Sequence, residues 1–118
     1  MKKYLIISVM LILAACAAKK TTQSQTSAAV PTESDYLASA QKIDPSMTSE
    51  TFSLTKNIFE TECNRCHGLK KPASRTPEAW QTIVPDMVKK ANRKGATISP
   101  EQEKNLLTYV LAVRQAGM

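Results

Sequence analysis

The chain has 118 residues, of which 16 are basic and 10 are acidic, and its formal net charge is +6. This length gives room for one small domain, and any targeting segment has to be set aside before the fold is considered. The positive charge does not indicate a nucleic-acid-binding protein, because the basic residues form no long stripe and no aromatic residues interleave with them.

The first residues have the layout of a secretory signal peptide. Lys2 and Lys3 form a positive start, residues 4–15 are almost entirely apolar, and small residues precede Cys16. The apolar run of about 12 residues is shorter than the roughly 20 that span a bilayer, which favours a signal peptide over a transmembrane helix. We therefore expect residues 1–15 to be a signal peptide and the protein to be exported.

The end of this segment, Leu13-Ala14-Ala15-Cys16, resembles the lipobox of bacterial lipoproteins. The resemblance implies cleavage before Cys16 and lipidation of its thiol, and several acyl chains together would anchor the protein firmly to a membrane. Ala17 follows the cysteine, which in Gram-negative members of that family slightly favours the outer membrane. The expected location is periplasm-facing and lipid-anchored, and a soluble periplasmic protein cleaved slightly later is the alternative.

Residues 16–50 are predicted to be the lipidated cysteine and a flexible tether. The segment is rich in Thr, Ser, Gln and Ala, and it has too few large apolar residues to offset the entropy cost of ordering. A short apolar patch of Tyr36, Leu37 and Ala40 leaves open that part of this segment is helical or docks on the domain.

Residues 51–118 are predicted to form a small all-α domain of three to four helices, because no segment alternates convincingly with a period of two residues. The first helix is expected from about Ser53 into a cysteine motif, with a break at Gly68. The second is expected after Thr76, which is a good N-cap and is followed by a proline at the first helical position.

The second helix carries an apolar stripe with helical spacing. Pro85 lies inside this stripe and predicts a kink or a break into two short helices. Gly95 is expected to follow the end of the helix. A last helix is predicted from Pro100 to about Ala116, because Ser99 has the spacing to Gln102 of a capping box. The stripe of the second helix consists of Trp80, Ile83, Val84, Met87 and Val88.

The motif Cys63-Asn64-Arg65-Cys66-His67 has the Cys-x-x-Cys-His spacing of c-type haem attachment. Two thiols at this spacing can bond to the two vinyl groups on one edge of a haem, and the adjacent imidazole is then carried to the iron. A covalent haem would also reinforce a domain of roughly 65 residues, whose protein core alone is marginal.

Three other interpretations of the motif are weaker. A disulfide between Cys63 and Cys66 would close a very small loop and stabilise the fold less than longer crosslinks do. A thioredoxin-like redox pair requires a βαβ pattern, which is absent from the sequence. A zinc site requires four ligands, and the mature chain has no further histidine or free cysteine beyond this motif.

With this motif, residues 53–118 resemble the class I monohaem cytochrome c family. The resemblance implies one covalently bound haem c, electron transfer rather than enzyme activity, and contact between Phe59 and Tyr109 where the first and last helices cross. The long loop that usually carries the distal methionine before the last helix is missing. The sequence instead looks like a compact branch with Arg75, Trp80 and a methionine on a helix.

The second axial ligand follows by elimination. His67 is the only histidine, so a second histidine ligand from this chain is excluded. Met47 lies in the predicted tether and Met118 at the chain end, which leaves Met87, although core packing alone would also explain a methionine there. Ligation by His67 and Met87 closes the iron to ligands and favours electron transfer. The alternatives are a five-coordinate haem that binds a small gas, and an accessory subunit of a larger oxidoreductase.

Basic residues are concentrated in the predicted haem domain, where residues 53–118 hold 11 basic and 6 acidic side chains. This surplus favours redox partner proteins with an acidic docking surface, although an ordinary solvated lysine face is as good an explanation. Candidates for the haem propionates or for this docking rim are Arg65, Lys70, Lys71 and Arg75. Pro72 is a candidate to orient the imidazole through its carbonyl.

Overall fold

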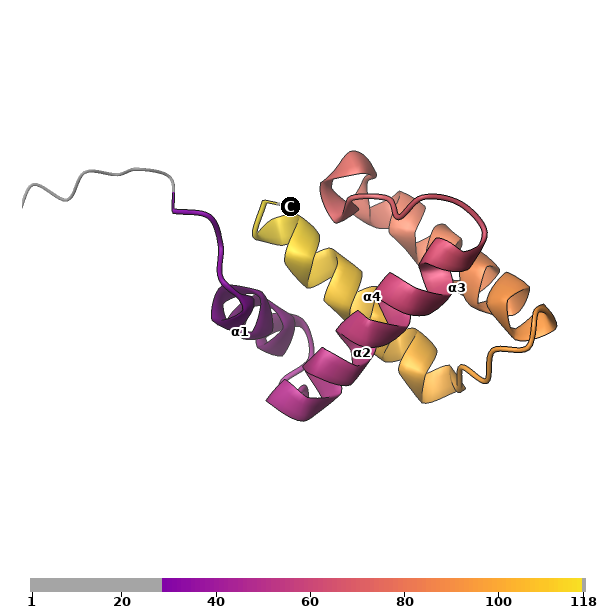
Figure 1. Cartoon of the computed structure of the whole chain (residues 1–118). Coiled ribbons are helices and arrows are strands. Elements are labelled where there is room, and N and C mark those ends of the chain that lie inside the picture. The colour runs from indigo at the N-terminus through magenta and orange to yellow at the C-terminus, as the bar shows by residue number, and fades with distance from the viewer. Residues whose placement is uncertain (1–28, 118) are drawn as a thin grey trace, which may run out of the picture.

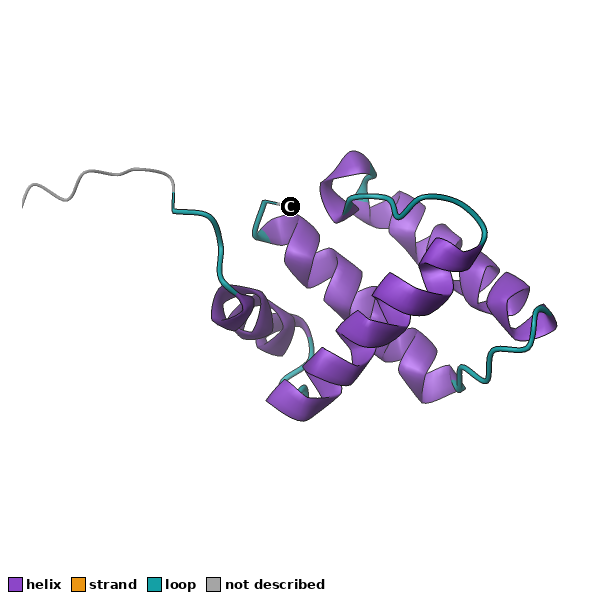
Figure 2. Cartoon of the chain, viewed as in Figure 1, coloured by secondary structure: helices purple, strands orange, loops and turns teal. Residues whose placement is uncertain are grey.

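The computed structural model describes residues 29–117, so the predicted signal peptide, the predicted lipidation site Cys16 and Met118 lie outside the described residues. This part of the chain is helical without any strand, which confirms the predicted all-α class (Figure 2). None of its helices is long and apolar enough to cross a membrane. The elements are α1 (Glu33–Ile43), α2 (Ser49–Glu62), the 3₁₀ turns η1 (Cys63–Arg65) and η2 (Pro72–Ser74), α3 (Pro77–Arg93) and α4 (Pro100–Gln115).

Helix α4 is the central element, because each of the other three helices packs against it. Figure 1 shows α2 lying across α4, with α1 near one end of α2 and the loop to α3 at the other. The crossing of α2 and α4 lies in the core, which also includes buried side chains of α1 and α3. Tyr109 packs between Phe52 and Phe59, with ring centroids 5.1 Å and 5.4 Å apart, which confirms the predicted contact between Phe59 and Tyr109.

The predicted starts of α3 and α4 are confirmed, because their capping side chains form the expected hydrogen bonds. The Thr76 hydroxyl accepts a bond from the Ala79 amide at 3.2 Å. At α4, the Gln102 amide donates to the Ser99 hydroxyl at 3.2 Å and the Ser99 amide donates to the Gln102 side chain at 2.9 Å. Gly95 follows α3 with a φ of 97°, a conformation that glycine adopts without steric cost.

Pro85 does not divide α3 into two helices, so of the predicted kink or break the break does not occur. A proline inside a helix removes the amide that would bond to the carbonyl four residues earlier, here that of Gln81. Both residues lie on the exposed face of α3, where water can solvate that carbonyl. The buried face of the helix therefore continues past the proline to Val88 and Ala91.

The N-terminal boundary of the folded unit differs from the prediction. Residues 16–50 were expected to be a tether, with docking of a short apolar patch left open, and in the structure this patch packs on the core as part of α1. Ala40 is completely buried, and Met47 after the helix is 2% exposed. Helix α2 also begins earlier than expected, because the Thr48 hydroxyl accepts a bond from the Thr51 amide at 3.1 Å. Residues 33–50 thus belong to the folded unit.

Helix α1 is fixed at both ends by polar contacts. Its first turn is capped by Asp35, whose carboxylate accepts a bond from the Thr32 amide at 2.8 Å. Glu33 pairs with Lys56 of α2 at 2.9 Å. At the other end, Asp44 pairs with Lys104 of α4 at 2.8 Å.

Replacing Asp44 with asparagine is expected to lower stability in a pH-dependent way. The hydrogen bond from Lys104, and then those from Ser46, lower the pKa of Asp44 to about 2. An unfolded aspartate has a pKa of about 3.9, so this stabilisation is present above about pH 4 and is lost as the pH falls towards 2. Urea unfolding should show a deficit for Asp44→Asn at pH 6 that disappears near pH 2. The exposed Asp86→Asn is the matched control, and a deficit that persists at pH 2 would contradict the assignment.

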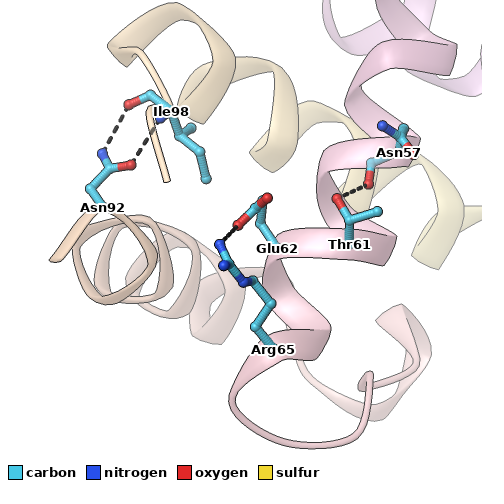
Figure 3. A network of polar contacts seen from close by, with 6 residues as sticks. All are labelled: Asn57, Thr61, Glu62, Arg65, Asn92 and Ile98. Atoms are coloured by element: carbon cyan, nitrogen blue, oxygen red, sulfur yellow. Dashed lines mark hydrogen bonds and ion pairs between the residues drawn. The ribbon is translucent and has the colours of Figure 1, made fainter. Parts of the chain in front are cut away.

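The loop between α3 and α4 is held by one asparagine side chain. The Asn92 amide nitrogen donates to the Ile98 carbonyl at 3.0 Å, and the Ile98 amide donates to the Asn92 side-chain oxygen at 2.9 Å (Figure 3). Ile98 is itself buried in the core. The two bonds therefore fix the short connection that directs the chain into α4.

Replacing Asn92 with alanine is expected to lower the free energy of unfolding by about 1–2 kcal/mol, because both hydrogen bonds are lost. Chemical denaturation followed by circular dichroism measures this value. Asn57→Ala is the control, because Asn57 contributes only its backbone carbonyl to the bond from Thr61 in Figure 3. Equal effects of the two substitutions would show that the Asn92 bonds contribute no net stability.

Candidate functional site

A cavity of about 220 Å³ lies between α2, α3 and α4 and is lined mainly by apolar side chains. Helix α3 contributes more side chains to the cavity wall than α2 or α4 does, because its apolar stripe faces α4. Three of the predicted site residues, Cys63, His67 and Met87, line this cavity together. The apolar wall consists of Phe59, Leu69, Trp80, Ile83, Val84, Val88, Leu106 and Val110.

The two cysteines of the motif have different surroundings. Cys63 is partly buried at the end of α2 and lines the cavity, whereas Cys66 is exposed and is not part of the cavity wall. Burial, followed by the charges of Glu62 and Cys66, raises the pKa of the Cys63 thiol to about 11. Both thiols are free, so neither is used in a disulfide among the described residues.

His67 is exposed at the edge of the cavity, and the geometry of its ring indicates which nitrogen is available. Its Nδ1 lies 2.9 Å from the Gly68 carbonyl oxygen. A carbonyl only accepts hydrogen bonds, so Nδ1 must carry the proton in this contact. The neutral ring then presents Nε2 as its lone-pair nitrogen, which is the form that binds a metal.

Met87 is the only one of the candidate methionines that reaches the cavity within the described residues. It is partly buried on α3, one turn after Ile83. Met47, which was set aside as part of the tether, is instead buried in the core, where its carbonyl accepts a bond from Gln41 at 3.0 Å. Met118 lies outside the described residues. The structure therefore places the predicted thioether and imidazole on one cavity.

The carbonyl of Pro72 has a different partner from the one predicted. It accepts a hydrogen bond from the indole Nε1 of Trp80 at 2.8 Å, in a buried position. Gly68 supplies the carbonyl that contacts His67 instead, because it directly follows the histidine in the chain. The Pro72 carbonyl thus fixes η2 against α3.

The four basic candidates divide between the cavity and the surface. Arg65 pairs with Glu62 at 2.7 Å and turns back towards α2 (Figure 3). Lys70 and Arg75 are exposed residues that line the cavity. Lys71 lines a second, smaller cavity instead. Two positive charges therefore stand at the opening of the main cavity.

The residues present fit a covalently attached haem in their chemistry. The cavity offers thiol and imidazole groups on the motif side, a thioether on α3 and an apolar wall between them. Its volume is smaller than that of most pockets for small molecules, which is roughly 300–1,000 Å³. However, Leu69 and Lys70 also line the second cavity of about 100 Å³. The two cavities therefore lie next to each other.

Sequence reasoning missed two contributions to this region. The contact of His67 with the Gly68 carbonyl could not be predicted, because a backbone carbonyl leaves no side-chain pattern in the sequence. Arg114 on α4 donates through Nε to the Arg75 carbonyl at 2.7 Å, and this contact joins residues 39 positions apart. Such a bond depends on the tertiary structure, so no local pattern predicts it.

Within residues 29–117, no group of three or more His, Cys, Asp and Glu side chains is arranged to hold a metal ion. The predicted iron ligands are one histidine and one methionine, so they are only two residues and include a type outside that group.

Comparisons of the chain with protein-family models, with curated proteins and with solved structures found no match.

Proposed function

We propose that the chain is a c-type cytochrome that transfers electrons and holds one covalently bound haem c. Cys63 and Cys66 would hold the haem through thioether links, and His67, through Nε2, and Met87 would be the protein ligands of its iron. The observation that carries the proposal is that Cys63, His67 and Met87 line one apolar cavity. The haem would supply a one-electron couple, and no substrate chemistry is required.

The protein residues would position this group and exclude water from it. The Gly68 carbonyl fixes the His67 ring in the tautomer whose Nε2 can bind a metal. The apolar side chains of α3 and α4 keep the surroundings dry, and a methionine ligand raises the reduction potential compared with a second histidine. Trp80 holds η2 against the same wall through its bond to Pro72.

The test is production of the full chain in a bacterial host with haem c maturation enzymes. The expected product retains haem on a denaturing gel, as detected by haem-dependent peroxidase staining. The Cys63→Ala/Cys66→Ala variant should lose this covalent signal. Cys16→Ala, which removes a cysteine outside the motif, is the matched control and should keep it. An unmodified wild-type polypeptide of normal abundance would contradict the proposal.

We also propose that the protein is exported and lipid-anchored through Cys16, on the lipobox-like sequence alone. The same Cys16→Ala variant tests this point by fractionation. It should leave the membrane fraction while its haem content stays unchanged. Wild-type protein that is recovered entirely in the soluble periplasmic fraction would contradict lipid anchoring.

The loop between α2 and α3 is proposed as the docking surface for acidic redox partners. Residues 63–76 contain four basic side chains and no acidic one, and all four are exposed. Leu69 lies among them and is 40% exposed, which adds an apolar contact to the charged rim. Acidic partners would be attracted to this loop mainly through their association rate.

The Lys70→Glu/Lys71→Glu variant is expected to slow oxidation of the reduced protein by the anion hexacyanoferrate(III) about tenfold at low ionic strength. The difference should shrink as salt is added, because exposed charges are screened beyond about 10 Å at 0.1 M. Stopped-flow spectroscopy measures the rate. Lys89→Glu/Lys90→Glu on α3 is the charge-matched control, and equal slowing by both variants would show that net charge, not this loop, is responsible.

A further inference from the structure

The short segment from Pro72 to Arg75, whose last residue lines the main cavity, is held by side chains from two helices. Trp80 of α3 donates to the Pro72 carbonyl at 2.8 Å, and Arg114 of α4 donates to the Arg75 carbonyl at 2.7 Å. Between them, Ser74 bonds through its amide and its hydroxyl to the Lys71 carbonyl, at 2.9 Å and 2.6 Å. The backbone of this segment is therefore fixed at both ends.

Arg75 itself is in a position to recognise an anion. It is exposed, it lines the cavity, and it has no ion-pair partner among the described residues. A guanidinium group presents two parallel donors that match the two oxygens of a carboxylate. A free carboxylate at the edge of a bound molecule is thus the chemistry that Arg75 fits.

Arg114 links the segment that carries Arg75 to helix α4. It lies in the last turn of α4, partly buried, and the only hydrogen bond of its side chain in the described structure is the one to Arg75. The pKa of Glu78 is lowered by its own backbone amide and by Thr76, with a smaller effect from the charge of Arg114. The bond to Arg75 thus places the Arg114 side chain near the start of α3, next to the segment that carries Arg75.

We propose that Arg114 is a positioning residue that holds Arg75 for contact with a carboxylate of the bound haem. This inference rests on the proposed function, because the carboxylates are those of a haem in the cavity. Arg114 fixes the backbone of Arg75, and a fixed backbone limits the directions that the guanidinium can sample. Without this bond the charge of Arg75 remains, but its position at the cavity opening is no longer defined.

The test is a double-mutant cycle on reversible porphyrin binding. The full chain carries Cys63→Ala/Cys66→Ala so that binding is not covalent, and the probes are ferric protoporphyrin IX and its dimethyl ester. Arg75→Gln should weaken binding of the free acid about tenfold and binding of the ester less than about twofold. Arg114→Gln should weaken binding of the acid about fivefold in the parent and have almost no effect in the Arg75→Gln chain.

Two controls separate positioning from stability. Arg114→Lys keeps a donor and should retain part of the affinity, whereas Arg93→Gln on α3 removes an exposed arginine of the same charge and should change nothing.

The same cycle on the midpoint potential of the covalently loaded chain gives a second readout. Loss of either arginine should lower this potential, and the effect of Arg114→Gln should vanish when Arg75 is absent.

Additive effects of Arg75→Gln and Arg114→Gln would overturn the proposal, and so would equal weakening of acid and ester by Arg114→Gln. Either result leaves the proposed function intact. A chain that acquires no covalent haem during maturation contradicts the proposed function itself. The failures of the two proposals are therefore distinguishable.

Discussion

Met87→Ala in the haem-loaded protein is expected to abolish the methionine–iron charge-transfer band and to lower the midpoint potential. The shift should be on the order of 100 mV, a modest part of the roughly 0.8 V range over which axial ligands set haem potentials. The reason is that Met87 is the one described methionine that lines the cavity with His67. Visible spectroscopy and a redox titration measure the two effects.

Ile83→Ala is the matched control for this experiment. Ile83 lies one turn before Met87, lines the same cavity and has a similar partly buried position, but it has no atom that can bind iron. Its loss should leave the band in place. Met87→Ala should also open the iron to carbon monoxide in the reduced protein. Rapid carbon monoxide binding by the wild-type protein would favour the five-coordinate alternative, whereas an unchanged band in Met87→Ala would show that Met87 is not the ligand.

Trp80→Ala is expected to lower the free energy of unfolding by about 3–5 kcal/mol, which is a large share of the 5–15 kcal/mol typical of a domain. Trp80 is 4% exposed and combines two roles, because its ring belongs to the core and its indole donates to Pro72. Urea unfolding followed by circular dichroism measures the loss.

Trp80→Phe separates these two roles. It keeps most of the aromatic surface and removes the hydrogen bond, so its expected cost is about 1–2 kcal/mol. Leu54→Ala is the control for an apolar residue of α2 that is 60% exposed, and it should change stability by less than about 0.5 kcal/mol. Equal costs for Trp80→Ala and Trp80→Phe would show that the bond to Pro72, and not the packing of the ring, dominates.

The starts of α3 and α4 could be predicted because the residues that mark a helix start lie next to it in the sequence. A capping side chain and a proline at the first position act within one turn, and the observed bonds of Thr76 and Ser99 are those that this chemistry requires. The part of the cavity wall that α3 forms could also be predicted, because the spacing of the apolar residues from Trp80 to Val88 places one face of α3 against the core.

The misjudged features have non-local causes. Helix α1 is polar overall, and it is stable because Ala40 and Met47 are buried against helices that come later in the chain. The local signals for it were the Thr32–Asp35 cap and the apolar patch of Tyr36, Leu37 and Ala40. At Pro85 a kink or a break was predicted, and the break, which does not occur, ignored which face of α3 the proline would occupy. A helix tolerates the lost bond when the orphaned carbonyl faces water.

The two ion pairs of α1 also affect how this helix unfolds locally. Glu33 pairs with Lys56 of α2 and Asp44 with Lys104 of α4, so unfolding of either end of α1 has to break an ion pair. Amides along α1 should consequently exchange their hydrogens together, through one cooperative opening that breaks both pairs and exposes Ala40. The chain that follows the predicted export signal thus enters the folded part through a helix that opens as one unit and that packs on α4.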